Sequence, residues 1–302
     1  MTAASTASTA SAAAEGLRPF PIAIAQTCPI LGGLAKNLES CAAIAEKAAA
    51  GGARLVVFPE LAATGYFLKD MVPDIALRRE DARLADLLLL SRKISIVLGF
   101  VEESPDFVHY NSAVYLEDGR IRAVHRKVYL PTYGVFDEAR FLAAGSTFRA
   151  FDTKLGRVAM LVCEDSWHLS APYVAVQDGA QVLVSIAASP VRGLPRGSRP
   201  VPAEAWEEMN RTYARLLGVY VVFANRVGYE DGVGFWGGSE IVAPDGSVAA
   251  KGPYFDEALV TGEIDPRAIR RARLVTPLFR DERLGLTIRE LSRILDEKEM
   301  RE

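Results

Sequence analysis

Three residues of chemically reactive type each follow an apolar run in this sequence. RLVVFP runs into Glu60, the strand after a predicted hairpin turn runs into Lys127, and GRVAMLV runs into Cys163. A cysteine attacks a carbonyl or nitrile carbon as the thiolate, so a neighbouring base has to take its proton. Glu60 can be that base and can later return the proton, while Lys127 can stabilise the developing oxyanion. These residue types suit a cysteine hydrolase that needs neither histidine nor metal.

Each of these residues also has an ordinary structural interpretation when it is taken alone. A free cysteine is among the most buried residue types, Glu60 could be a loop carboxylate, and Lys127 could be a solvated cation. Their conjunction favours a site, because sites in open α/β sheets gather at the carboxyl ends of strands. Cys163 precedes the polar stretch EDSW, which predicts a turn into a helix whose N-terminus lowers the thiol pKa. Cys28 and Cys41 lack this setting and are predicted to be structural.

The hydrophobic pattern predicts the elements that position these residues. Apolar runs predict strands at 21–26, 54–59, 94–100, 156–163, 181–187, 219–225 and 258–265. Asp-Gly turns at 118–119 and 245–246 predict two hairpins. Helices are predicted over 34–50, 79–93, from 164 to about 179, from about 202 to 217, and over 282–298. Strands alternating with helices, with hairpins interspersed, indicate a mixed sheet layered with helices in the α/β or α+β class.

Length and composition limit the classes of protein that are compatible with the sequence. The 302 residues, 50% hydrophobic, predict a single domain over 19–302 with a terminal extension and helix, after a disordered Ala/Ser/Thr-rich tail over 1–18. A net charge of −3 argues against nucleic acid as a partner. No segment has the roughly 18 to 20 uninterrupted apolar residues of a membrane span. Three cysteines fit a reducing, cytoplasmic compartment, and three histidines leave little room for a metal site.

The segments that carry the reactive residues resemble the nitrilase, or carbon–nitrogen hydrolase, superfamily over roughly residues 20–265. The matching segments are LVVFPELAATGY (55–66), HRKVYLPTYGVFDEARFLAAG (125–145), GRVAMLVCEDSWH (156–168) and NRVGYEDGVGFWGGSEIVAPDG (225–246). The resemblance implies a four-layer α-β-β-α sandwich, a homodimer or higher homo-oligomer, and no cofactor. It carries over Glu60 as general base, Lys127 as oxyanion stabiliser and Cys163 as nucleophile. Glu138 matches the second glutamate, which could orient Lys127 and the substrate.

Within the superfamily, the segments around Lys127 and Cys163 are most similar to the glutaminase domain of glutamine-dependent NAD synthetases. That similarity implies that Tyr66 and Tyr133 line the amide pocket, and it matches Ser189 to a serine near that pocket. Glu164 and Trp167, beside the nucleophile, are further candidates for substrate contact, although Glu164 could equally cap the next helix. No SGGxDS-type loop for ATP phosphates is found in the sequence, so the synthetase reaction is not expected of this chain.

The sequence therefore predicts a cytoplasmic, cofactor-free amidase that cleaves a linear amide through a cysteine thioester and releases ammonia or an amine. One alternative is a glutaminase subunit that delivers ammonia to a separate synthetase partner. A nitrilase is less expected, because the nucleophile is followed by Glu-Asp rather than Trp-Glu. A catalytically idle scaffold is disfavoured, because burying an intact charged triad costs folding energy. The Gly- and aromatic-rich segment 232–238 could be a pocket lid or an oligomer contact.

Overall fold

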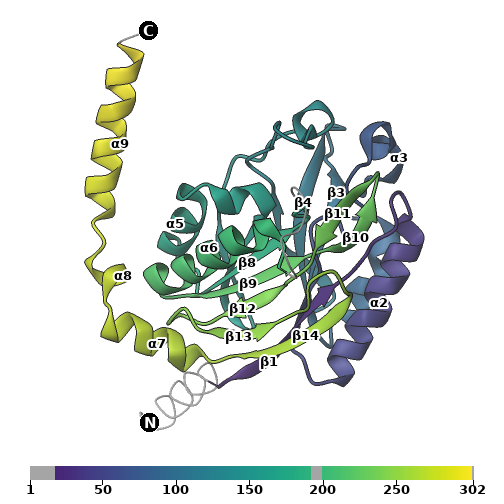
Figure 1. Ribbon diagram of the computed structural model, residues 1–302, viewed down its shortest axis with the longest axis horizontal. Coiled ribbons are helices and arrows are strands. Elements are labelled where there is room, and N and C mark those ends of the chain that lie inside the picture. The colour runs from purple at the N-terminus through teal and green to yellow at the C-terminus, as the bar shows by residue number, and fades with distance from the viewer. Residues whose placement is uncertain (1–17, 192–198, 301–302) are drawn as a thin grey trace, which may run out of the picture.

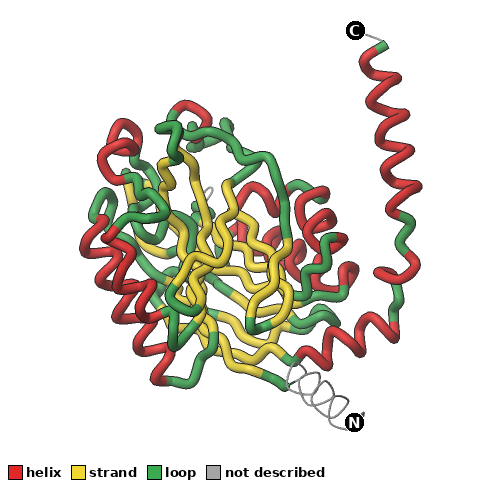
Figure 2. Tube along the Cα trace, turned by 180° about the vertical axis from the view of Figure 1, so that it is seen from behind, coloured by secondary structure: helices red, strands yellow, loops and turns green. Residues whose placement is uncertain are grey.

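Alternate side chains along each central strand face two different apolar layers, and this alternation builds the fold. In strand β1 (Phe20–Gln26), Ile22 and Ile24 face the other sheet, whereas Ala23 and Ala25 face a helix. The computed structural model, which describes residues 18–191 and 199–300, is a four-layer α-β-β-α sandwich (Figures 1 and 2). Apart from Arg18, the predicted tail over 1–18 lies outside the described residues.

Two six-stranded mixed sheets form the inner layers. The first has the order β14-β1-β2-β3-β4-β5, with β2 (Leu55–Val57), β3 (Ser95–Glu103), β4 (His109–Glu117), β5 (Arg120–Arg126) and β14 (Ala258–Ile264). The second has the order β13-β12-β9-β8-β7-β6, with β6 (Ala150–Thr153), β7 (Gly156–Val162), β8 (Val182–Ala187), β9 (Tyr220–Asn225), β12 (Glu240–Val242) and β13 (Val248–Lys251). Three neighbouring strands are parallel in each sheet, β1-β2-β3 in the first and β9-β8-β7 in the second, so their carboxyl ends lie at one edge of each sheet.

Helices cover the outer face of each sheet (Figure 1). Helices α2 (Leu34–Ala50) and α4 (Ala85–Leu90) pack on the first sheet, and α5 (Ser170–Gln177) and α6 (Val201–Leu217) pack on the second. The short α3 (Val72–Ile75) lies near the end of β3. After β14 come α7 (Pro266–Val275), α8 (Leu278–Asp281) and α9 (Leu284–Glu299), and both views show α9 standing away from the sheets. None of the helices described is long and apolar enough to cross a membrane.

The predicted class and layering are confirmed, and the differences are local. The predicted strand over 54–59 is shorter, because Pro59 has no N–H to donate to a ladder. The predicted helix over 79–93 begins later, because the extended Asp81 caps a 3₁₀ turn before α4. The segment 232–238 lies largely in a hairpin of β10 (Val227–Glu230) and β11 (Val233–Trp236), in which Phe235 and Trp236 are buried, and its role as a lid or an oligomer contact stays a prediction. The prediction missed the strands β6, β10 and β11 and the helices α3, α7 and α8.

Candidate active site

Cys163 lies at a sharp backbone turn at the carboxyl end of β7. Its φ of +47° is in the left-handed region, which is costly for a residue with a Cβ atom. Such strain persists only where the surroundings enforce it, and it turns the chain abruptly from the strand into a 3₁₀ turn, η4 (Cys163–Trp167). The structure corrects the predicted helix entrance: α5 begins only at Ser170, and Cys163 is 6% exposed rather than open to solvent.

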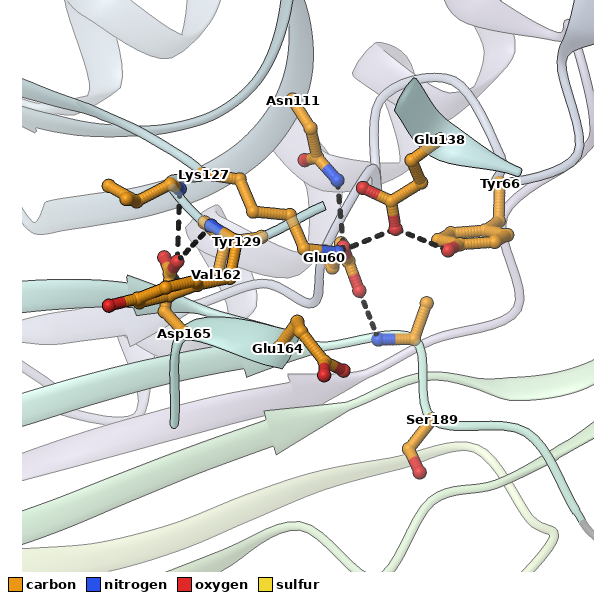
Figure 3. Close-up of polar contacts among 12 residues, drawn as sticks. Glu60, Tyr66, Asn111, Lys127, Tyr129, Glu138, Val162, Glu164, Asp165 and Ser189 are labelled. Atoms are coloured by element: carbon orange, nitrogen blue, oxygen red, sulfur yellow. Dashed lines mark hydrogen bonds and ion pairs between the residues drawn. The ribbon is translucent and has the colours of Figure 1, made fainter. Parts of the chain in front are cut away.

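Glu60, Lys127 and Glu138 form a buried charged cluster (Figure 3). Lys127 directly follows β5, and its Nζ donates to Glu60 Oε1 at 2.8 Å and to Glu138 Oε1 at 2.6 Å. Glu60 follows the short strand β2, and Glu138 begins a 3₁₀ turn, η3 (Glu138–Arg140). The lysine is fully buried, so a partner is required to hold its charge. Three of the predicted site residues are thus in direct contact.

Two further groups hold the Glu60 carboxylate in place. Asn111 Nδ2 donates to Oε1 at 2.7 Å, and the backbone N–H of Ala188 donates to Oε2 at 2.7 Å. The first contact comes from β4 and the second from the chain just beyond β8, so both sheets orient this side chain (Figure 3). Sequence reasoning missed Asn111, although a polar amide within an apolar strand is a signal that it has a buried partner.

The electrostatics of the cluster follow from burial and from two carboxylates sharing one ammonium group. Burial lowers the pKa of Lys127, but the charges of Glu138 and Glu60 outweigh it and hold that pKa well above its usual range. Burial raises the pKa of Glu138. Burial also raises the pKa of Cys163 well above its usual range, and the charge of Glu60 adds to this, while Lys127 acts in the opposite direction. The thiol is therefore protonated at neutral pH, contrary to the predicted lowering.

A cleft of about 300 Å³ opens over Cys163 and brings together four of the predicted substrate-binding residues. Its lining includes Tyr133, Glu164, Trp167 and Ser189. The Tyr133 hydroxyl donates to the Glu164 carboxylate at 2.9 Å. The side chain of Ser189 accepts hydrogen bonds from two buried tryptophan N–H groups, so it supports the wall of the cleft. Trp167 is 43% exposed at the rim.

Tyr66 lies elsewhere, on the far side of Glu138. Its hydroxyl donates to Glu138 Oε1, and the ring lines a separate cavity of about 180 Å³ with Phe67, Phe141 and other residues. Burial raises the pKa of the phenol well above its usual range, and the charge of Glu138 adds to the effect. The phenol is therefore a neutral donor at physiological pH. Tyr66 thus contacts the charged cluster, and its predicted place in the amide pocket stays a prediction.

A buried ion pair that sequence reasoning missed supports Tyr66. Arg226 Nη1 lies 2.5 Å from Glu230 Oε2, and both side chains are buried. Glu230 Oε1 accepts the backbone N–H groups of Tyr66 at 2.7 Å and Phe67 at 2.5 Å. The pair therefore ties the β10 hairpin to the loop that carries Tyr66. The available signal was the pair of opposite charges in NRVGYE, Arg226 and Glu230.

This arrangement can carry out nucleophilic chemistry with its own side chains. The Cys163 thiol is subject to the charge of a carboxylate whose orientation is fixed and to that of an ammonium group whose charge is maintained by two carboxylates. Residues 18–191 and 199–300 contain no group of three or more His, Cys, Asp or Glu side chains that could hold a metal ion. A nucleophile, a base and an oxyanion donor are the groups that acyl transfer requires.

Comparison with solved structures places this fold among the nitrilase-type enzymes. The carbon-nitrogen hydrolase of Helicobacter pylori G27 superposes with a TM-score of 0.77 at 25% identity, covering 89% of this chain and 97% of that one. The glutamine-dependent NAD+ synthetase of Acinetobacter baumannii superposes with a TM-score of 0.75 at 28% identity, covering 83% of this chain and 47% of that one. The sandwich and the resemblance expected from the sequence are thereby confirmed.

The chain belongs to the carbon-nitrogen hydrolase family, whose sequence profile matches residues 21–274. Among curated proteins, it is 35% identical to the glutamine-dependent NAD(+) synthetase of Rhodobacter capsulatus, over 85% of this chain and 46% of that protein. It is 30% identical to the human omega-amidase NIT2, over 85% of this chain and 93% of that protein. The chain thus spans about half the length of the synthetases that it matches and nearly all of the amidase.

Proposed function

We propose that this protein is an amidase that hydrolyses a linear amide through a thioester on Cys163. The observation that carries the proposal is the buried Lys127 bridging Glu60 and Glu138, with the Cys163 thiol subject to the charges of all three. A scaffold gains nothing from such a cluster, since burying charged groups costs folding energy unless they are paired. Family membership and the near full-length match to an omega-amidase support the same class of reaction.

In the first half of the reaction, Glu60 takes the thiol proton as Cys163 Sγ forms a bond with the carbonyl carbon. The carbonyl π electrons move to oxygen, and the Lys127 ammonium group stabilises the oxyanion. When the carbonyl re-forms, the C–N bond breaks and its electron pair stays on nitrogen. Glu60 donates its proton to that nitrogen, and ammonia or an amine leaves. The raised thiol pKa makes this base necessary, because little thiolate exists at rest.

In the second half, a water molecule attacks the thioester while Glu60 takes one of its protons. The C–S bond breaks, the carboxylic acid is released, and the proton returns from Glu60 to the Cys163 sulfur. The Tyr133 and Glu164 pair at the cleft suits an acyl group that carries a hydrogen-bond donor or a positive charge. The remaining lining, with Trp167 and Trp206, suits an apolar stem.

A substrate panel with two cysteine variants tests the proposal. Linear amides, nitriles, carbamoyl amino acids and glutamine are scored by ammonia release, and intact-protein mass spectrometry follows the acyl adduct during turnover. We expect an adduct on Cys163 and no turnover by Cys163→Ala. Cys28→Ala is the matched control, because Cys28 is exposed and outside the cleft, and it should retain activity. Full activity of Cys163→Ala would exclude the proposed mechanism, and turnover of nitriles in preference to amides would reassign the substrate.

A second candidate is a glutaminase that supplies ammonia to a separate synthetase. The match to about half the length of several glutamine-dependent NAD(+) synthetases favours it, and so does the acidic Glu164 in the cleft, which could pair with the ammonium group of glutamine. The same panel separates the candidates. Glutamine turnover that rises on adding an ATP-dependent partner supports the glutaminase. Efficient turnover of other amides, with glutamine a poor substrate, supports the free-standing amidase.

A further inference from the structure

The carboxylate of Asp165 is completely buried and lies among four hydrogen-bonding groups. Its Oδ1 accepts the backbone N–H groups of Val128 at 2.9 Å and Tyr129 at 3.1 Å. Its Oδ2 accepts the N–H of Val162 at 3.0 Å and lies 2.8 Å from Nε2 of His125. Figure 3 shows the side chain pointing from η4 toward Tyr129 and Val162. No other role in the proposed mechanism falls on Asp165 or His125.

The groups held by Asp165 belong to two different sheets. Val162 is the last residue of β7 and directly precedes Cys163, whereas Val128 and Tyr129 directly follow Lys127. Because β5 and β7 belong to separate hydrogen-bonded sheets, strand pairing does not set the position of the lysine relative to the thiol. The Asp165 carboxylate connects the two chain segments beside the reacting groups directly.

The surroundings of Asp165 keep it in the form that this role requires. Burial raises its pKa, but the hydrogen bond from His125 and the backbone donors outweigh burial and hold that pKa below its usual range. The carboxylate is therefore ionised at neutral pH and can accept a hydrogen bond from each of the four donors. Ring contacts fix the neighbouring side chains, since His125 lies 5.7 Å from the Phe148 ring and Tyr129 stacks on His168 at 3.5 Å.

We infer that Asp165, with His125 as its side-chain donor, is a positioning residue that sets the Cys163 sulfur against the Lys127 ammonium group. The inference rests on the proposed amidase function for its kinetic readout. A misplacement of about 1 Å can cost about a hundredfold in rate, so a direct connection between the two segments has kinetic value. Positioning also explains why a histidine is present near a site whose chemistry uses none.

Two substitutions at different partners test the connection. In Asp165→Asn the side chain keeps its shape, but one acceptor becomes an NH₂ group that faces backbone N–H donors. We expect kcat to fall about a hundredfold while KM changes by less than about threefold, because only the reacting geometry is altered. At His125, Gln retains a donor where Leu does not, and we expect His125→Gln to keep about tenfold more activity than His125→Leu.

Glu240→Gln is the matched control for loss of a buried carboxylate. Glu240 is fully buried in the second sheet and accepts from Asn210 at 2.9 Å and Lys251 at 3.1 Å, away from the cleft. It should lose stability, measured by urea unfolding, without loss of kcat. The inference is overturned if Asp165→Asn shows only the stability loss of this control, or if His125→Gln and His125→Leu are equally active.

Cysteine alkylation tests the inference separately from the proposed function. The full-length chain is treated with iodoacetamide at pH 8.5, and peptide mapping gives the rate at Cys163 relative to the exposed Cys28. If Asp165 positions Lys127 against the thiol, Asp165→Asn should lower this ratio at least about fivefold, because the lysine charge favours the thiolate. A rise in this ratio would indicate that Asp165→Asn only loosens the turn that carries Cys163, and it would overturn the inference. Should no amide be hydrolysed by the wild type, the proposed function fails while this ratio still decides the role of Asp165.

Discussion

Replacing Glu60 by glutamine should separate the chemistry of the site from its contribution to folding. Glutamine keeps the shape of the side chain, but it cannot take a proton from the Cys163 thiol. General-base catalysis typically contributes between about 10² and 10⁴ in rate, so we expect kcat to fall by about a thousandfold. The amide would also place an NH₂ group against the N–H of either Ala188 or Asn111, both of which donate to Glu60 now.

The expected effect of Glu60→Gln on stability is much smaller than the loss of a buried ion pair would suggest. At 2.8 Å and an effective dielectric constant of about 20, the charges of Glu60 and Lys127 attract by about 6 kcal/mol. The neutral amide loses this attraction, but it also avoids the desolvation of a buried carboxylate, which costs several kcal/mol. Lys127 keeps its contact with Glu138 at 2.6 Å. We expect a net loss of about 1–3 kcal/mol in the free energy of unfolding.

The assay pairs ammonia release with urea unfolding, and Glu240→Gln is again the control. Glu240 resembles Glu60 closely, since it is buried and shares Lys251 with a second glutamate, Glu207, at 2.5 Å. Both variants should unfold at similar urea concentrations, but only Glu60→Gln should lose turnover. Turnover by Glu60→Gln within about tenfold of the wild type would refute the assignment of Glu60 as general base, since that is less than general-base catalysis ordinarily provides.

Two further predictions concern the thiol and the ion pair behind Tyr66. Burial and the charge of Glu60 raise the pKa of Cys163, so alkylation of this thiol should be slower than that of Cys28 at pH 7–9 and should accelerate at higher pH. In Glu60→Gln the pH midpoint of Cys163 alkylation, measured by peptide mapping, should move down, because the charge of Glu60 is lost. An upward shift would contradict this explanation of the raised pKa. Glu230→Gln should cost about 3–5 kcal/mol in urea unfolding, because Arg226 is left buried without its counter-charge. The neighbouring Asp231→Asn removes only an exposed pair with Lys69 and should cost less than about 1 kcal/mol, so equal losses would disprove the account.

The location of the site could be predicted from the sequence because it depends on local rules. A buried strand that runs into a polar residue places that residue at a sheet edge, and parallel strands bring their carboxyl ends to one edge. Glu60, Lys127 and Cys163 each satisfied this rule, and the structure brings Glu60 and Lys127 into direct contact. Glu138 was matched only through the resemblance of its segment to the family, yet it completes the cluster.

The protonation of the nucleophile could not be predicted from the sequence. The polar stretch after Cys163 indicated a helix entrance and a lowered thiol pKa, but η4 is a five-residue 3₁₀ turn and the thiol is buried beside Glu60. A pKa depends on burial and on charges that approach through space, and Glu60 is about a hundred residues away along the chain. The contact of Tyr66 with Glu138 could not be predicted for the same reason, since Glu138 belongs to another segment.

The sequence by itself determined the layers of this protein and the reactive residue types at its strand ends, because side-chain alternation and strand termination are properties of neighbouring residues. Only the tertiary structure decided which polar groups meet. Asn111 bonds to Glu60 across 51 positions, Asp165 bonds to Val128 across 37, and Glu230 bonds to Tyr66 across 164. Each contact joins elements that are distant in the chain and approach one another only in the folded protein, so no local pattern predicts it.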